Sequence, residues 1–138
     1  MLSEASGGPL AAAVAAANVH DTKLLDATLS ALVIERPDPA HVPQHLCLDK
    51  AYDNPTGERV VAKHRYIGHI RRIGEEKLDE NAERRYPTRR WVVERLIGWL
   101  NRCRGILVRY EKKPENYLAL IQLACALLWY RKLAYRSF

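Results

Sequence analysis

The stretch of the chain that most constrains the fold is a strand, a helix and a second strand in close succession. The short apolar run His45–Asp49 ends in a carboxylate, and a turn-rich segment follows it. Pro55 is typical of a first helical turn, and the apolar run Tyr66–Ile70 follows that helix. This spacing predicts a β-α-β unit with parallel neighbouring strands. Ligands of open α/β sheets gather outside the carboxyl ends of strands, where Asp49 is expected.

A second organising segment is the helix predicted over residues 90–104. Its apolar side chains recur at steps of four, three and four, which predicts a buried stripe. Glu94 lies off that stripe, and Gly98 occupies a helix interior at a cost of roughly 1 kcal/mol against alanine. Either Gly98 leaves open space near a functional Glu94, or Glu94 is a solvated partner of Arg90 and Gly98 permits close packing. The stripe comprises Val92, Leu96, Trp99 and Cys103.

Other elements follow from turn and capping signals. Residues 10–17 form an apolar run that predicts a buried strand with no clear hairpin mate after it. Asp21 is a suitable N-cap for a helix through Leu32, which makes a capping Asp and an incidental His20 the preferred account of that pair.

The second half of the chain contains two further predicted segments around the helix at 90–104. Residues 71–90 are the most charged part and predict a basic loop. After a C-cap at Gly105, residues 106–110 predict a short extended piece. Pro114 begins a last helix over 114–132 that is apolar nearly all round, and we expect it to be core.

Composition narrows the class of protein. The 138 residues, 48% of them hydrophobic, are enough for one domain with a real core. The net charge of +6 favours a polyanionic partner, DNA first and an anionic membrane surface second. The three cysteines are widely spaced and lack a C-x-x-C pair, so we expect buried thiols in a reducing compartment. The apolar stretch 117–130 is shorter than the roughly 20 residues of a membrane span, which predicts a soluble cytoplasmic protein without a membrane partner.

Two carboxylates, Asp49 and Glu94, stand out by context as candidate ligands. Brought together by packing, they could hold Mg²⁺ or Mn²⁺, which take oxygen ligands. Two such ions would support phosphodiester chemistry. The arginines around them could neutralise phosphates without reading bases, although a solvated face is an equally good account. The arginines in question are Arg71, Arg72, Arg90, Arg95, Arg102 and Arg104.

Three segments of the chain together resemble the catalytic domain of bacterial insertion-sequence transposases of the DDE class. They are ANVHDTKLL (17–25), LCLDKAYD (46–53) and the long run that begins RRWVVERLIGW and ends at Arg131. The resemblance implies an α/β, ribonuclease-H-like mixed sheet flanked by helices, incomplete at the N-terminus. It also implies magnesium-dependent or manganese-dependent cleavage of DNA at element ends and joining of those ends to target DNA.

The resemblance also implies roles for individual residues. Asp49 matches the aspartate of the family's D-K-G-Y-D motif, the second catalytic carboxylate, with Ala51 where glycine is usual. Glu94 matches the glutamate of W-x-V-E-R, the third carboxylate, and Glu4 stands at the position of the first aspartate. Lys50 joins the arginines above as an expected DNA contact.

The missing opening strand leaves alternatives open. The chain could be the carboxy-terminal part of a transposase catalytic domain that works with an upstream half and as a homo-oligomer. Alternatively, it could be a non-catalytic, basic DNA-binding remnant. A third reading is a basic structural or RNA-binding protein without a site.

Overall fold

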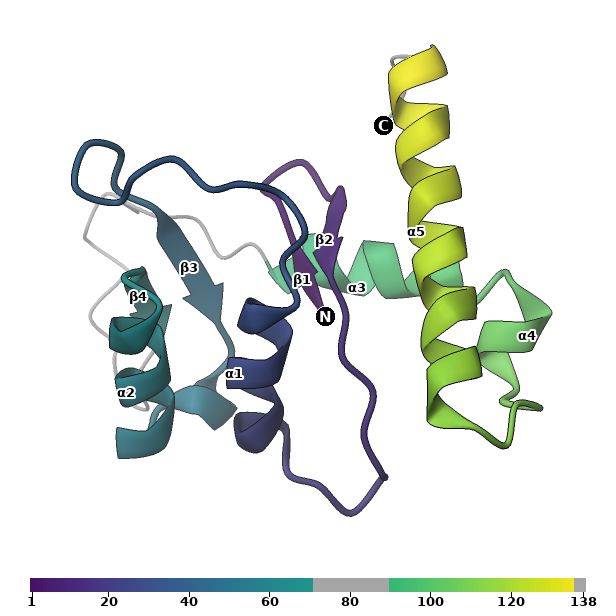
Figure 1. Ribbon diagram of the computed structural model, residues 1–138, viewed down its shortest axis with the longest axis horizontal. Coiled ribbons are helices and arrows are strands. Elements are labelled where there is room, and N and C mark those ends of the chain that lie inside the picture. The colour runs from purple at the N-terminus through teal and green to yellow at the C-terminus, as the bar shows by residue number, and fades with distance from the viewer. Residues whose placement is uncertain (71–89, 136–138) are drawn as a thin grey trace, which may run out of the picture.

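The computed structural model describes residues 1–70 and 90–135, with only the backbone described at Arg90 and Tyr135. The basic loop expected at 71–90 therefore lies outside the described residues, apart from the helical backbone at position 90. The described residues form an α/β protein with two small sheets. Figure 1 shows β3, β4, α1 and α2 on one side of the β1–β2 hairpin and the long helix α5 on the other.

The predicted β-α-β unit is confirmed. Strands β3 (His45–Leu48) and β4 (Ile67–Ile70) are parallel and pair in unbroken register. The short 3₁₀ helix η1 (Lys50–Tyr52) and helix α2 (Pro55–Lys63) connect them. Asn54 caps α2 by accepting hydrogen bonds from the backbone N–H groups of Thr56 and Gly57, which satisfies donors that a helix start leaves free.

Helix α1 (Asp21–Ser30) packs beside α2 and covers the same face of the β3–β4 sheet. Its N-cap is His20, whose Nδ1 accepts from the Thr22 N–H at 3.3 Å, so the prediction that Asp21 is the cap was wrong by one residue. The side chain of Asp26 ties α1 to α2 through the Nε2 of His64 at 2.6 Å. The apolar core here is Leu25, Leu29, Leu46 and Val61.

The N-terminal residues form a hairpin, which the sequence did not reveal. Strand β1 (Leu2–Ser3) pairs antiparallel with β2 (Pro9–Ala11), and Gly7 makes the turn with a φ of 97°. A positive φ suits glycine, which has no Cβ to clash. The strand predicted over 10–17 is therefore only its first two residues plus Pro9, and its mate precedes it rather than follows it.

The two pairs of strands remain separate sheets in the described part of the chain. One sheet is β1–β2 and the other is β3–β4, with no hydrogen-bonded pairing between them. Parallel and antiparallel pairing both occur, as a mixed sheet requires, but not within one continuous sheet. The described residues therefore show an α/β fold with two small sheets, and they do not show the continuous ribonuclease-H-like mixed sheet that was expected.

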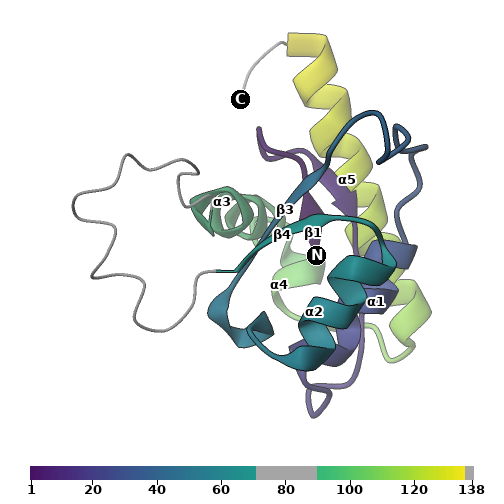
Figure 2. The same cartoon turned by 90° about the vertical axis from the view of Figure 1, so that its left-hand side faces the viewer.

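Helix α3 (Arg90–Leu100) lies against the hairpin and against α5. The expected stripe is buried at Val92 and Leu96, which are 2% and 0% exposed, and it continues through Leu100. Cys103 falls after the helix end and is exposed, because the chain turns there. Figure 2 looks nearly along α3 and shows it beside the strands.

The segment after α3 begins with a short helix, so the extended piece predicted over 106–110 is wrong at residues 106 and 107, and Gly105 lies inside this helix rather than capping the previous one. Helix α4 (Arg104–Leu107) makes a single turn before helix α5 (Pro114–Tyr135) begins at the predicted proline. The phenol of Tyr117 donates to the carbonyl of Ile106 at 2.8 Å and so joins the two helices. A non-local hydrogen bond of this kind leaves no periodic signal in the sequence.

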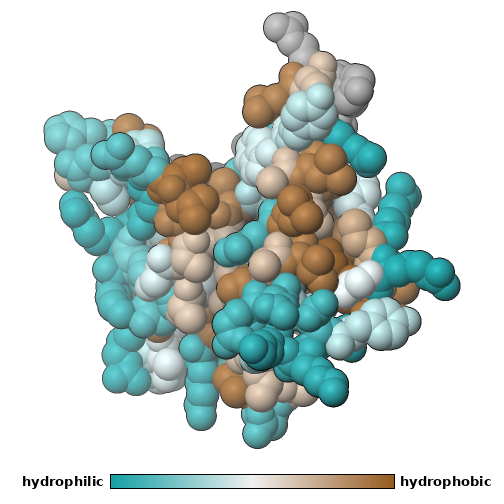
Figure 3. Space-filling model, turned by 45° about the vertical axis from the view of Figure 1, so that its right-hand side comes forward, coloured by the Kyte–Doolittle hydropathy of each residue, from teal (hydrophilic) through white to brown (hydrophobic). Residues whose placement is uncertain are grey.

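Helix α5 is less buried than its composition suggested. Ile121 and Ala124 face the core, whereas Leu123, Leu127 and Leu133 are exposed. Figure 3 shows apolar side chains grouped on the face of the molecule that carries α5. Among the described residues, α5 is the helix that is long and apolar enough, over 114–134, to cross a membrane. Core helices of soluble proteins share this property.

The cysteine prediction also needs correction. Cys47 and Cys103 are exposed and Cys125 is half-buried, so only the last has the character of a core thiol. Burial raises the pKa of the Cys125 thiol above its ordinary value. The exposure of Cys47 arises because it lies on the sheet face opposite α1 and α2.

Candidate functional site

Asp49 stands directly after β3, at the carboxyl end of the parallel pair, as the sequence predicted. It is exposed, and its Oδ1 accepts a hydrogen bond from the Lys50 N–H at 2.7 Å, which caps η1. Burial raises the pKa of the neighbouring Tyr52 phenol, and the negative charges of Asp21 and Asp49 raise it further. Asp21, at the start of α1, and Asp49, after β3, thus both act on this phenol.

Asp21 is an acidic residue near this site whose predicted role was wrong. It was predicted to cap α1, but the N-cap is His20, and the charge of Asp21 contributes, after burial, to the raised pKa of the Tyr52 phenol. It also raises the pKa of the Met1 amino group, which burial lowers by a larger amount. The sequence showed only that His20 and Asp21 are adjacent. The contact between α1 and η1, which brings Asp21 near Tyr52, is visible only in the structure.

Glu94 lies on the exposed side of α3, off the buried stripe, as expected. A Cβ built on Gly98 would meet nothing within 4 Å beyond its own helix and chain neighbours. Close packing is therefore not the reason for this glycine in the described part of the chain. The alternative that Gly98 leaves open space one turn from Glu94 agrees with the structure.

Glu4 is tied into the fold. It lies in the turn between β1 and β2, where it forms an ion pair with Lys132 of α5 at 2.5 Å and accepts from the backbone N–H groups of Ser6 and Gly8. Partial burial raises the pKa of this carboxyl group, but the hydrogen bonds from Lys132, Ser6 and Gly8 outweigh that effect and lower it to about 2.

The expected DNA-binding residues differ in how exposed they are and in what they contact. Arg95 makes intramolecular contacts: its guanidinium donates a hydrogen bond to the Ser6 carbonyl at 3.0 Å and lies over the rings of Trp91 and Trp99. Arg102 and Arg104 are exposed just beyond the end of α3, and Lys50 is half-buried beside Asp49. Residues Arg71 and Arg72, and the side chain of Arg90, lie outside the described residues.

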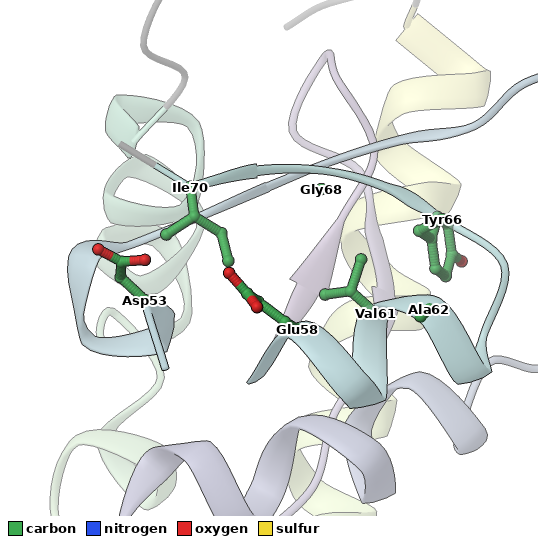
Figure 4. A pocket seen from close by; sticks show the side chains of 7 residues that line it. All are labelled: Asp53, Glu58, Val61, Ala62, Tyr66, Gly68 and Ile70. Atoms are coloured by element: carbon green, nitrogen blue, oxygen red, sulfur yellow. The ribbon is translucent and has the colours of Figure 1, made fainter. Parts of the chain in front are cut away.

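A pocket of about 230 Å³ lies between α2 and β4 and adds two acids that the sequence did not single out. Figure 4 shows the carboxyl groups of Asp53 and Glu58 at the Ile70 end of the pocket, with Tyr66 at the other end. Asp53 belongs to the same DKAYD segment as Asp49, four residues later. Glu58 carried no sequence signal beyond its favourable place in the first turn of α2.

The donor chemistry suits a hard divalent cation, since Asp49 and Glu94 both offer exposed carboxylate oxygens. The described residues nevertheless contain no group of three or more His, Cys, Asp or Glu side chains placed to hold a metal ion. Glu4, Asp49 and Glu94 are thus not gathered into one three-carboxylate cluster. Asp49 and Glu94 are exposed at the surface, and Glu4 forms an ion pair with Lys132 of α5.

Comparison with known families gives the decisive observation. The family described as the transposase DDE domain matches residues 1–129, which is nearly the whole chain. The chain belongs to this family of DDE transposases. The matched range includes the positions of Glu4, Asp49 and Glu94.

A relative supports the same assignment. The chain is 28% identical over 136 residues to a protein assigned as the transposase for insertion sequence element IS402 of Burkholderia cepacia. The alignment covers 96% of this chain but 62% of that relative, so the chain spans less than two thirds of the relative's length. No solved structure matches the chain.

Proposed function

We propose that this DDE transposase takes part in DNA transposition by metal-dependent cleavage and transfer of DNA strands. The observation that supports this proposal most directly is the family match over residues 1–129. Two exposed carboxylates also support it as candidate ligands: Asp49 at the carboxyl end of β3, and Glu94 on α3 one turn from the open space at Gly98.

Asp49 and Glu94 are the proposed ligands of Mg²⁺ or Mn²⁺. When bound there, such an ion would supply the Lewis-acid chemistry that phosphodiester cleavage by water or a 3′-hydroxyl needs. In this proposal the fold holds one carboxylate at the end of a strand and the other on a helix. Ligands held on regular elements have a fixed geometry for the substrate phosphate. The anchoring of Glu4 by Lys132 favours a structural part for that residue in the proposal.

We assign contacts with the DNA backbone to basic side chains that are exposed or that adjoin Asp49, and not to every arginine that the sequence suggested. Arg102 and Arg104 are exposed beyond the end of α3, and Lys50 adjoins Asp49. Arg71, Arg72 and Arg90 remain part of the proposal on sequence grounds alone. Arg95 is given a structural part because its guanidinium is committed to Ser6 and to two tryptophan rings. Neutralising phosphates with these groups gives affinity without reading sequence.

The proposed partners of the protein are the DNA of the element ends, the target DNA and a further transposase chain or segment. Among the described residues, the β1–β2 and β3–β4 pairs do not hydrogen-bond to each other, and the edge of a sheet can pair with a further strand. An upstream segment or half that supplies such a strand, and assembly with a second copy, fit this arrangement. The proposed location is the cytoplasm, where bacterial DNA lies.

The test is nicking of supercoiled plasmid by the purified protein with Mg²⁺ or Mn²⁺. We expect Asp49→Asn and Glu94→Gln each to reduce the nicking rate at least about 100-fold, because each change removes an anionic metal ligand. Glu115→Gln, which removes a carboxylate at the start of α5, is the matched control and should nick as the parent does. Normal nicking by either ligand variant would contradict the catalytic assignment.

A second candidate, DNA binding without cleavage, is favoured by one observation. The described residues do not gather three carboxylates, which a catalytic DDE centre would use. In that case neither metal ion supports nicking, but DNA is still retarded in gel shifts. Replacing both Arg102 and Arg104 with Gln would then weaken binding for all sequences alike and lower its salt dependence.

A further inference from the structure

The face of the β3–β4 sheet that turns away from α1 and α2 carries two histidines. Side chains alternate along a strand, so Leu46 faces the helices while its neighbours His45 and Cys47 face the other way. In the parallel register His45 pairs with Ile67 and Cys47 pairs with His69. His45 and His69 are therefore diagonal neighbours on one sheet face.

The two imidazole rings approach each other closely. The Nδ1 of His45 lies 2.7 Å from the Nε2 of His69, and the rings are stacked with centroids 5.0 Å apart and an interplanar angle of 22°. His45 is exposed and His69 is half-buried, so solvent reaches the pair. Two ring nitrogens from adjacent strands thus converge on one small region.

Facing nitrogens can share only one proton, since two N–H groups aimed at each other would repel. Burial lowers the pKa of His69, and the neighbouring His45 lowers it further, so the neutral ring is favoured. The neutral imidazole is the form that ligates metals, and imidazole suits late first-row divalent ions. A metal bound by both nitrogens at about 2.0–2.1 Å would need them roughly 3.3 Å apart, so the two rings would have to move slightly apart to bind it.

We propose that His45 and His69 form a two-histidine site for a late first-row divalent transition-metal ion such as Zn²⁺. Among the described residues, no third His, Cys, Asp or Glu is grouped with them as a ligand. The site is separate from Asp49 and Glu94 in both residues and chemistry, because imidazole nitrogens select a softer ion than carboxylate oxygens do.

Binding at this site would cross-link β3 to β4. The two strands already share a ladder, and a metal bridge between their side chains would oppose their separation. Because an ion that binds only the folded state stabilises it by mass action, occupancy should raise the melting temperature. Strand β3, which Asp49 directly follows, would be held more firmly without any metal at the carboxylates.

The test is calorimetric titration of the untagged 138-residue protein with Zn²⁺, together with thermal unfolding. We expect one equivalent to bind and the melting temperature to rise. His45→Asn and His69→Asn should each weaken binding at least tenfold and abolish the rise. His41→Asn, an exposed loop histidine paired with Asp38, is the matched control and should behave as the parent does.

Two further variants keep the proposal falsifiable. Cys47→Ser should retain Zn²⁺ affinity, and Asp49→Asn should do so as well, because neither residue is an assigned ligand. Undiminished affinity in both His45→Asn and His69→Asn would overturn the proposal, as would a loss in Cys47→Ser equal to that in the histidine variants. A separate readout is the circular dichroism of each metal-free variant, which should match the parent because His45 is exposed.

Discussion

Glu4 shows how much one side chain contributes to joining distant parts of the chain. Its carboxylate is bound by Lys132, 128 residues later, and by two backbone N–H groups of its own turn. A carboxylate with several donors is stabilised in its charged form. This residue therefore links the hairpin to α5 only while it is ionised.

We expect Glu4→Gln to lower the free energy of unfolding near pH 7 by about 1 kcal/mol, since a charge-assisted bond becomes a neutral one. The folded pKa of about 2 lies below the ordinary 4.5, so the contribution is complete above pH 4.5 and is lost as the pH falls toward 2. Urea unfolding of both proteins from pH 7 to pH 2 is the measurement. A difference between them that stayed constant across this range would contradict the argument.

At the scale of one element, α3 carries a glycine that its own packing does not require. An added Cβ at Gly98 would meet open space, whereas one at Gly68 would lie 3.1 Å from the Cγ1 of Val61. Glycine in a helix interior costs more backbone entropy than alanine does. The glycine at position 98 thus lowers the stability of this helix without a compensating contact among the described residues.

Gly98→Ala should raise the free energy of unfolding by about 0.5–1 kcal/mol, measured by urea denaturation with a two-state fit. Gly68→Ala serves as the matched comparison and should lower it, because Val61 would have to move in a packed core. A destabilised Gly98→Ala protein would mean that the space beside Gly98 is filled.

The whole molecule is joined across the β1–β2 hairpin. Arg95 of α3 reaches the Ser6 carbonyl, and the Trp129 indole of α5 donates to the Pro9 carbonyl at 2.6 Å. Lys132 completes the set at Glu4. The helices α3 and α5 therefore attach to the rest of the protein through the hairpin, while one face of α5 stays open.

That arrangement predicts opposite results on the two faces of α5. Ile121→Ala should cost about 2–4 kcal/mol, because Ile121 is 9% exposed and its removal leaves a cavity. Leu123→Ala should change stability by less than about 0.5 kcal/mol, since Leu123 is 68% exposed. Chemical denaturation at low protein concentration measures both. Equal losses in the two variants would show that the outer face is also packed.

Much of the fold could be predicted because its signals are local. Pro55 and Pro114 begin helices, and two short apolar runs on either side of a predicted helix indicated the parallel strand pair. The same signals placed Asp49 at a strand end and Glu94 off the buried stripe. Capping was less certain, since His20 and Asp21 can both accept from a helix start and only the local geometry chose His20.

The sequence by itself determined the strand–helix–strand unit, the helix starts and the positions of two candidate carboxylates, because backbone propensity and periodicity act within a few residues. Only the tertiary structure decided that Arg95 faces inward, that α5 exposes one apolar face, that Glu4 is held by Lys132, and that His45 meets His69. These outcomes depend on which surfaces meet across long stretches of chain. Such non-local contacts leave no periodic pattern in the sequence.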